Sequence, residues 1–373
     1  MVAEFINHFE TIKDPRIDRC KAHALLDILF LAISAVLSGY EEIEDFGINK
    51  ESWLKQYLPF ENGIPSHDTI SRVFSRLNPE QVQMSFISWV SSIIEKVEGQ
   101  VIAIDGKTAR GTFKPQGREN ALHMVSAWSC QHHLVLGQQK VAGKSNEITA
   151  IPHLLELLDL EGSIITIDAM GCQKSIVAKI VAHEADYVIG LKGNQLGLKE
   201  ECLAWLHKAE REGYQACQYA FLEAVDFGHG RIETRRVTQV SIDSNWLSQK
   251  YRFAGLQSII CVDSERIQKE KTSTERRYYI SSLPVDAAKA MQVVRSHWQV
   301  ESMHWMLDMT FKEDASQIKS GNAPEIMNVI RKIALNIMKN DPTKKASIKP
   351  KLKMAATNDE YRSALIANAV IMR

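Results

Sequence analysis

The sequence predicts a mixed α/β protein, and three observations lead to this prediction. Short apolar, β-branched runs such as Val101–Asp105 and Ile164–Asp168 alternate with helical patterns in the middle of the 373-residue chain. Residues 1–98 show helical patterns throughout, whereas residues 213–282 show the short alternating segments that are typical of antiparallel strands. A chain of this length exceeds a single typical core, so we expect two or three domains.

The composition is that of an ordinary soluble protein. Hydrophobic residues make up 45% of the chain, and 45 basic residues balance 45 acidic ones. Because no global excess of positive charge would attract a polyanion, any nucleic-acid binding must come from local patches. The six cysteines show no C-x-x-C or zinc-finger spacing. The most apolar segment, Ile28–Leu37, is shorter than the roughly 20 residues that cross a bilayer, and no signal peptide is evident. We therefore expect a cytoplasmic protein.

Residues 1–98 are expected to form a helical N-terminal domain. Apolar periodicity predicts long helices over Ala24–Ser38 and Phe86–Val97. Between them, the turn signal Gly63–Pro65 precedes a polar stretch that can begin another helix.

Ser66 can cap this shorter helix, which is predicted over His67–Leu77 and carries Arg72 and Arg76. A helix, a turn and a capped helix with two arginines could form a helix-turn-helix that reads DNA. The same pattern also fits a helical bundle whose arginines face water. Both interpretations stay open at this point.

Residues 99–212 have the element order of a ribonuclease H-like domain, in which three strands come first and helices then alternate with strands. The expected strands are Val101–Asp105, Met124–Trp128, Leu134–Val141, Ile164–Asp168 and Tyr187–Leu191, and the expected helices are Glu147–Leu158, Gln173–His183 and Leu198–Glu210. In this order Asp105 ends the first strand and Asp168 ends the fourth. Those two strands are neighbours in that fold.

The remainder of the chain divides into three parts. Residues 213–282 are expected to form a β-rich insertion, with strands in Ala216–Val225, Arg231–Ser241, Phe253–Val262 and Arg276–Ser281. Residues 283–340 return to a helical pattern and include a helix over about Val285–Met309. Residues 341–373 are predicted to be a basic C-terminal tail, which would either bind DNA non-specifically or only keep the chain soluble.

Three acidic residues are the best candidates for a functional site. Asp105 and Asp168 follow apolar strands, and such positions face the crevice where α/β sheets hold ligands. Taken alone, Asp105 could be exposed in an Asp-Gly turn, and Asp168 could cap a helix. Glu301 lies with Trp298 and Trp305 on the apolar stripe of its helix, and a carboxylate buried there requires a metal or a basic side chain. Three converging carboxylates would suit Mg²⁺ or Mn²⁺.

The helix that carries Glu301 also allows a different metal site. His297, Glu301, His304 and Asp308 stack at helical spacing, and such a column could hold zinc. The H-E-x-x-H pattern is missing and no strand-end histidine accompanies the aspartates, so the all-oxygen site is favoured. His297 and His304 would then contact DNA phosphate or orient Glu301.

Five long motifs occur in order along the chain. They are IDGKTARG at 104–111, IDAMGCQ at 167–173, GLKGNQ at 190–195, HGRIETR at 229–235 and HWQVESMHWMLD at 297–308. These motifs, together with Asp14–Arg16 and Gly63–Thr69, closely resemble those of the H-repeat-associated transposases of bacterial insertion sequences. That family belongs to the DDE cut-and-paste group, and the resemblance runs through almost the whole chain.

The resemblance implies a ribonuclease H-like catalytic core interrupted by the β insertion. It also implies that Asp105, Asp168 and Glu301 are the catalytic, metal-binding triad. The wider group often shows a tyrosine, arginine, glutamate and lysine signature around its last acid. At the three other positions this chain has Val294, His297 and Asp308, so the roles of the arginine and the lysine are not carried over.

The function implied is that of a DNA transposase using Mg²⁺ or Mn²⁺. Two ions would serve opposite sides of the scissile phosphate, with Asp105 bridging both, first for hydrolysis at an element end and then for strand transfer. The partners would be double-stranded DNA, as element ends and as target, and further copies in a homodimer or higher oligomer. Such a protein would associate with the nucleoid when bound to DNA. A catalytically silent DNA-binding descendant and, less favoured, a zinc-dependent hydrolase are the alternatives.

Several basic and polar side chains are candidates for holding DNA. The positions are Lys107, Arg110, Lys192, Asn194, Arg231, Arg235, His297 and His304, with Arg72 and Arg76 in the N-terminal region. Arg231, Glu233 and Arg235 share one strand face because side chains alternate along a strand. The two arginines could grip a DNA backbone while Glu233 orients them, or the three could form a surface charge ladder.

Overall fold

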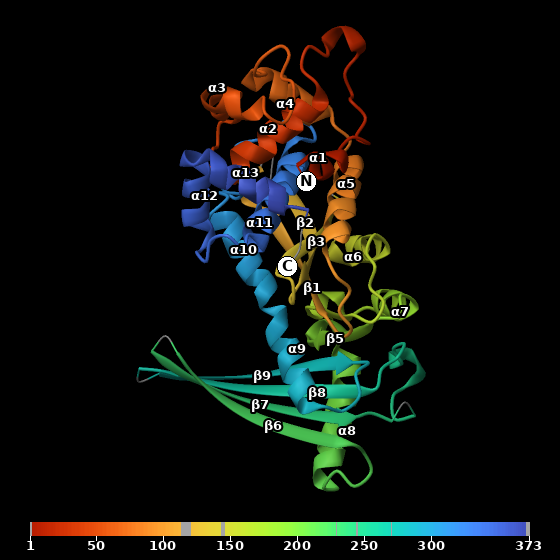
Figure 1. Ribbon diagram of the computed structural model, residues 1–373. Coiled ribbons are helices and arrows are strands. Elements are labelled where there is room, and N and C mark those ends of the chain that lie inside the picture. The colour runs from red at the N-terminus through yellow and green to blue at the C-terminus, as the bar shows by residue number, and fades with distance from the viewer. Residues whose placement is uncertain are drawn as a thin grey trace.

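One mixed sheet forms the centre of the molecule. A computed structural model describes residues 2–112, 121–142, 146–228, 230–243, 245–269 and 271–370, and in these residues nine strands pair in the order β3-β2-β1-β4-β5-β9-β8-β7-β6. The strands are β1 Val101–Ala109, β2 Leu122–Ser129, β3 Leu134–Lys140, β4 Ile164–Ile167, β5 Asp186–Leu191, β6 Tyr219–Gly228, β7 Arg231–Ser241, β8 Ser258–Gln268 and β9 Lys271–Ser281. Most helices of the two chain ends gather at one end of the molecule, and β6–β9 lie at the other (Figure 1). The predicted α/β class is confirmed.

Strand β1 is longer than the sequence suggested. It pairs with β4 in parallel only as far as Ile104 and Ile167, but its antiparallel pairing with β2 continues to Ala109 opposite Leu122. Asp105 therefore lies within a strand. The predicted strand end at Asp105, and with it the Asp-Gly turn, is wrong, because hydrogen bonds to β2 keep Gly106 in extended conformation.

The two faces of the sheet carry different helices. Asp105 and Lys107 point to the face covered by α9 Ala287–His297, α10 Gln299–Met309 and α11 Ala323–Asn340. Gly106 and Thr108 alternate with them and face the side of α6 Glu147–Glu156, where His123 links the Thr108 hydroxyl to Glu147. Two further helices of this region are α7 Lys174–Ala182 and α8 Leu196–Arg211.

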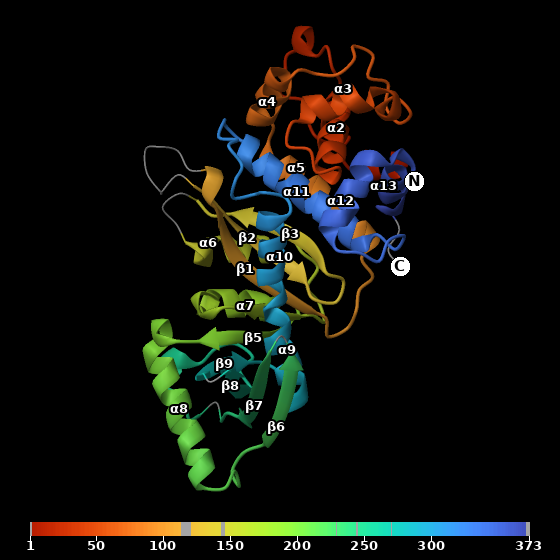
Figure 2. The ribbon, with the colours of Figure 1, turned by 90° about the vertical axis from the view of Figure 1, so that its left-hand side faces the viewer.

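The β-rich insertion continues the central sheet. Strands β6 to β9 form an antiparallel meander, and β9 pairs with β5 from Val188 opposite Ser281 to Leu191 opposite Tyr278. Figure 2 shows α8 beside these strands. The four predicted strand segments are therefore present, but they are part of the same sheet as the candidate acids.

Helices α9 and α10 replace the single helix that was predicted over about Val285–Met309. Trp298 lies between them with helical dihedral angles of φ −65° and ψ −12°, so the two run nearly end to end. They extend from β6–β9 towards the helical end of the molecule (Figures 1 and 2). Asp286 caps α9 by accepting hydrogen bonds from the backbone N–H groups of Ala288 and Lys289.

The N-terminal helices are α1 Val2–Asn7, α2 Leu25–Leu37, α3 Ile43–Leu54, α4 His67–Arg76 and α5 Pro79–Ile93, and short 3₁₀ turns lie at Asp18–Cys20, Arg110–Thr112, Ala169–Gly171, Gly193–Gln195 and Gln249–Tyr251. Helices α2, α4 and α5 correspond to the three predicted helices, but α5 begins and ends earlier than the predicted Phe86–Val97. Helix α2 contains the apolar segment Ile28–Leu37 and is buried against α11 and α3. No described helix is both long enough and apolar enough to cross a membrane.

The C-terminal residues do not form an exposed basic tail. They fold into α12 Ile348–Thr357 and α13 Asp359–Asn368, which pack among the N-terminal helices. Lys351 is buried, donates to the Met338 carbonyl at 2.9 Å and forms an ion pair with Asp341 at 3.1 Å. The Trp89 indole N–H donates to the Ala369 carbonyl at 2.7 Å. The prediction of a tail is wrong, because its apolar residues complete the helical end of the core.

Candidate catalytic site

The pairing of β1 with β4 places the two candidate aspartates side by side. The parallel pairing ends with Ile104 opposite Ile167, and the next residue on each strand is Asp105 or Asp168. Asp168 accepts a hydrogen bond from the Met170 backbone N–H at 2.9 Å, so it caps the 3₁₀ turn that follows. The predicted capping role of Asp168 is confirmed.

Glu301 reaches the same place from helix α10. With Asp105 and Asp168 it lines a cavity of about 340 Å³ between β1, β4, β5, β9 and the junction of α9 with α10. Glu301 itself is exposed, and the tryptophans on either side, Trp298 and Trp305, are 43% and 62% exposed. The expectation that Glu301 lies on a buried stripe is wrong, because α10 buries another face.

The electrostatics of the cavity favour a cation. Burial raises the pKa of Asp105 to about 7, although a hydrogen bond from the Gly106 backbone opposes this rise. The negative charges of Glu147, Asp168 and Glu301 raise it further. Like charges close together disfavour ionisation, and a positive ion among them would remove that penalty. The acids therefore need a counter-charge that the described side chains next to Asp105 do not supply.

The carboxylate oxygens of the three acids suit a hard divalent ion, but the acids do not surround a common metal position. In the described part of the chain, no group of three or more His, Cys, Asp or Glu side chains is close enough to hold a metal ion. The zinc column is not formed either. His297 faces Thr166, His304 faces Asp105, and Asp308 pairs with Lys107, so these side chains have separate partners. Three carboxylates on one cavity fit Mg²⁺ or Mn²⁺ by chemistry and charge.

Both histidines next to the acids are neutral at physiological pH. His297 Nδ1 lies 3.0 Å from the Thr166 hydroxyl, and burial lowers the pKa of His297 to about 4. His304 Nδ1 lies 3.5 Å from an Asp105 oxygen, and burial lowers its pKa to about 3. Neither side chain brings the positive charge that a phosphate contact would use. Their positions favour the alternative role of orienting neighbouring groups, with His304 beside Asp105.

Lys107 and Arg110 differ in their surroundings. The Lys107 ammonium forms ion pairs with Asp308, Glu313 and Asp314, which favours a structural role over the predicted phosphate contact. The Arg110 side chain is exposed near the same cluster, and its guanidinium lies 3.8 Å from Asp314. The Arg110 side chain is therefore accessible to a ligand, whereas the Lys107 ammonium is occupied by its three carboxylate partners.

The other predicted DNA contacts are spread over the molecule. Lys192 lines the cavity with the acids, whereas Asn194 donates to the Ala169 carbonyl at 2.6 Å and braces the turn after β4. Arg231 and Arg235 lie on one face of β7 outside the cavity. Glu233 stands between them, 2.6 Å from Arg235 and 3.8 Å from Arg231, as the two-residue period predicted. His229 lies outside the described residues.

Sequence reasoning missed four basic residues that lie near the acids. Lys199, Arg276 and Arg277 line the cavity, and Arg277 lies over the Trp298 ring at 4.4 Å from its centre. The two arginines come from β9, and no local signal shows that β9 pairs with β5. Lys332 of α11 is buried against β2 on the same face of the sheet as Asp105, where it donates to the Ser126 hydroxyl at 2.8 Å. Burial lowers the pKa of Lys332 to about 7.

Arg72 and Arg76 lie far along the chain from the acids, on helix α4. Ser66 caps this helix as predicted, by accepting from the Thr69 N–H at 3.4 Å, and both arginines are exposed. Residues 55–66 connect α3 to α4. This connection is longer than the roughly three- to four-residue turn of a helix-turn-helix.

Comparison with known proteins identifies the family of the chain. Residues 97–337 match the family model described as Transposase DDE domain, and residues 6–90 match one described as DDE_Tnp_1-associated. "Putative transposase YncI" of Escherichia coli O157:H7 is 41% identical over 379 residues, covering 98% of this chain and 95% of that protein. "H repeat-associated putative transposase YhhI" of Escherichia coli (strain K12) is 40% identical over 374 residues, 98% of each chain. "Inactive transposase YbfQ" of the same strain is 49% identical over 76 residues, 20% of this chain and 90% of that protein. The chain belongs to the H-repeat-associated DDE transposase family.

Proposed function

We propose that the protein is a metal-dependent DNA transposase that hydrolyses phosphodiesters at element ends and transfers the freed strand ends to target DNA. The observation that carries the proposal is that Asp105, Asp168 and Glu301, which are far apart in the sequence, line one cavity. The raised pKa of Asp105 adds the electrostatic demand for a cation. The strand order β3-β2-β1-β4-β5, with β1, β4 and β5 parallel, supports a ribonuclease H-like core.

The three acids are the proposed ligands of the divalent ions. Mg²⁺ or Mn²⁺ held there would neutralise charge on the phosphate and lower the pKa of the attacking water or hydroxyl group. The neutral ring of His304 lies 3.5 Å from an Asp105 oxygen and is proposed to orient this carboxylate. We propose that cations on the cavity wall, Lys192, Lys199 and Arg276, bind the sugar-phosphate backbone of the DNA; Arg276 also pairs with Asp263.

The remaining parts of the proposal concern DNA recognition and assembly. The N-terminal helical domain, residues 1–98, is proposed to contact the element ends through Arg72 and Arg76 of α4, which are exposed and therefore accessible. Residues 99–212 and 283–340 would form the catalytic core, with 213–282 as an insertion that adds Arg276 to the cavity wall. We further propose that the protein acts in the bacterial cytoplasm, on the nucleoid, as a homodimer or higher oligomer on double-stranded DNA.

The test is a cleavage assay on DNA that carries the sequences flanking the coding region. Purified wild-type protein should nick these ends with Mg²⁺ or Mn²⁺ and not with EDTA, and Asp105→Asn and Glu301→Gln proteins should not. Equal cleavage by the wild-type and Asp105→Asn proteins would show that the assignment of the acids is wrong.

A second candidate function is DNA binding without catalysis. It is favoured by the finding that no described group of acidic or histidine side chains is gathered tightly enough to hold a metal. A wild-type protein that binds the element ends specifically but leaves them intact in Mg²⁺ and in Mn²⁺ would support this candidate instead.

A further inference from the structure

Lys107 lies at the centre of a second group of carboxylates, next to the candidate catalytic site. It follows Asp105 by two residues on β1 and faces the same side of the sheet. Its ammonium lies 2.6 Å from Asp308, 2.5 Å from Glu313 and 3.2 Å from Asp314, and its side chain is only 12% exposed. These ion pairs join β1 to residues about 200 positions away in the sequence.

The three partners belong to two different elements. Asp308 is in the last turn of α10, seven residues after Glu301 and therefore about two turns along the same helix. Glu313 and Asp314 lie in residues 310–322, which we call the α10–α11 link. Lys107 thus ties the end of the helix that carries Glu301 to the strand that carries Asp105.

The pairing cannot be released without a large penalty. Glu313 is 2% exposed, and its other carboxylate oxygen accepts from the Asn328 side-chain amide of α11 at 2.5 Å. If Lys107 turned away to bind a DNA phosphate, the buried Glu313 would lose the ammonium 2.5 Å away and keep only the more distant charges of Arg331 and Lys332, which is unfavourable. We therefore expect Lys107 to keep these ion pairs when DNA binds.

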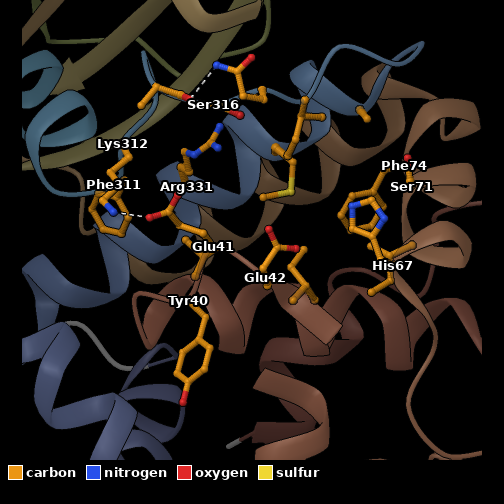
Figure 3. A pocket seen from close by; sticks show the side chains of 18 of the residues that line it. Tyr40, Glu41, Glu42, His67, Ser71, Phe74, Phe311, Lys312, Ser316 and Arg331 are labelled. Atoms are coloured by element: carbon orange, nitrogen blue, oxygen red, sulfur yellow. Dashed lines mark hydrogen bonds and ion pairs between the residues drawn. The ribbon is translucent and has the colours of Figure 1, made fainter. Parts of the chain in front are cut away.

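The α10–α11 link is also held from its other side. Asn322 donates from its backbone to the Ser75 carbonyl at 3.0 Å and from its side chain to the Leu77 carbonyl at 2.9 Å, at the end of α4. Figure 3 shows the ion pair between Lys312 and Glu41 at the edge of a cavity between the link and the N-terminal helices. With the link anchored there, the contact with Lys107 adds a polar tie to the buried apolar residues Val300, Met303 and Leu307, which pack α10 into the core.

We infer that Lys107 is a positioning residue, which sets the place of Glu301 relative to Asp105 through its ion pair with Asp308. This inference rests on the proposed function, because it concerns the geometry of the same acids. It replaces the predicted role of Lys107 as a contact to DNA phosphate.

The chain offers a matched pair of variants for the test. Asp308→Asn removes the ion pair that reaches α10 and leaves Lys107 paired with Glu313 and Asp314. Asp314→Asn also removes one ion pair to the same ammonium, but in the link and not on α10. Both aspartate side chains are 29% exposed, so the two variants disturb the surface to a similar degree.

Mn²⁺ affinity is measured by titration calorimetry on the full-length protein without DNA, with thermal unfolding recorded for each variant. Asp308→Asn is expected to bind Mn²⁺ at least about tenfold more weakly than wild type, the loss typical when a group that supports a metal ligand is removed. Asp314→Asn should stay close to wild type. Equal Mn²⁺ affinities for the two variants would overturn the inference. A wild-type protein that binds no Mn²⁺, either free or on element-end DNA, would instead overturn the proposed function, and the inference with it.

DNA binding in EDTA separates positioning from a phosphate contact. For Lys107→Met, the salt dependence of DNA affinity should equal that of wild type. A salt slope smaller by about one unit would mean that Lys107 holds a phosphate, and would overturn the inference. Where Lys107→Met does not fold, Lys107→Arg keeps the charge but alters the contact geometry. The Lys107→Arg protein should then have the wild-type salt dependence of DNA binding but a weaker Mn²⁺ affinity. A wild-type Mn²⁺ affinity in this variant would contradict the positioning role.

Discussion

Two trios of carboxylates lie next to each other along β1 and α10, and they differ in one feature. Asp308, Glu313 and Asp314 surround the ammonium of Lys107, and their charges are partly neutralised by it. The other trio, Asp105, Asp168 and Glu301, lines a cavity whose wall carries lysines and arginines, but none of these pairs with the trio in the described part of the chain, and the charges of Asp168 and Glu301 act against the ionisation of Asp105. The first trio holds the structure together through Lys107. The second trio has an excess of negative charge that a bound cation can neutralise.

The comparison separates acidic residues that stabilise the fold from those that can work on a ligand. Both trios lie between β1 and the region of α10. In the sequence, their members occur within or just after the motifs that resemble those of the transposase family. Burial alone does not distinguish them, because Glu313 is more buried than Asp105. The presence of a fixed partner does. A carboxylate with a fixed cation has little reason to bind a metal, and one without a partner has much.

The largest effect is expected on the rate of DNA cleavage when one acid of the unpaired trio is replaced. Asp105→Asn should lower the rate of DNA cleavage at least about ten-thousandfold, which corresponds to about 5.4 kcal/mol. The physical reason is the loss of the charge that would bind a divalent ion. Single-turnover cleavage of element-end DNA measures this, with Asp314→Asn as the control from the paired trio. A comparable loss in both variants would remove the distinction between the trios.

The next effect concerns the stability of the paired trio. Lys107→Met should lower the free energy of unfolding by about 3–5 kcal/mol, because it leaves Glu313 buried without its cation. Urea unfolding at pH 7 measures the change. Simultaneous Glu313→Gln should restore part of it, since the stranded charge is then gone. No restoration in the double variant would mean that the loss arises from packing.

The pH dependence of stability should show the effect of burial and of the neighbouring negative charges on Asp105. The pKa of Asp105 is raised to about 7 in the folded protein, so the folded state binds more protons than the unfolded state between roughly pH 4 and 7. Its contribution therefore reduces stability as pH rises through this window. Without metal, Asp105→Asn should gain about 2–3 kcal/mol relative to wild type between pH 4 and pH 8. Urea unfolding in EDTA at several pH values tests this, and a pH-independent difference would contradict it.

The smallest effect compares one aspartate from each trio by the same substitution. Asp314→Asn should cost about 0.5–1 kcal/mol, the usual value of a partly exposed ion pair. Asp168→Asn should be neutral or slightly stabilising, because asparagine can also accept the hydrogen bond from Met170 N–H and no longer repels Asp105. Thermal unfolding in the absence of divalent ions measures both. The reverse order would mean that the two groups of acids do not differ as described.

Much of the local structure could be predicted from the sequence. The apolar runs that precede Asp105 and Asp168 are buried parallel strands, Ser66 caps α4, and alternation places Arg231, Glu233 and Arg235 on one face of β7. These features depend on neighbouring residues and on the period of helix or strand, which a sequence displays directly.

Other features needed contacts between distant segments. The pairing of β9 with β5 brings Arg276 and Arg277 to the cavity, and the folding of residues 341–370 over the N-terminal helices buries Lys351. The exposure of Trp298 and Trp305 also depends on which face of α10 meets the sheet. A helical period shows that a stripe exists but not what covers it.

The sequence by itself determined the candidate acids, the strands before two of them, and the family to which the chain belongs. Only the tertiary structure decided which acids have a fixed partner. The charge state and role of a carboxylate depend on cations a few ångströms away in space, and those cations come from segments that the linear order does not bring together. Lys107 shows this most clearly, since its position in a resembling motif indicated a ligand contact and its three ion pairs indicate a clamp.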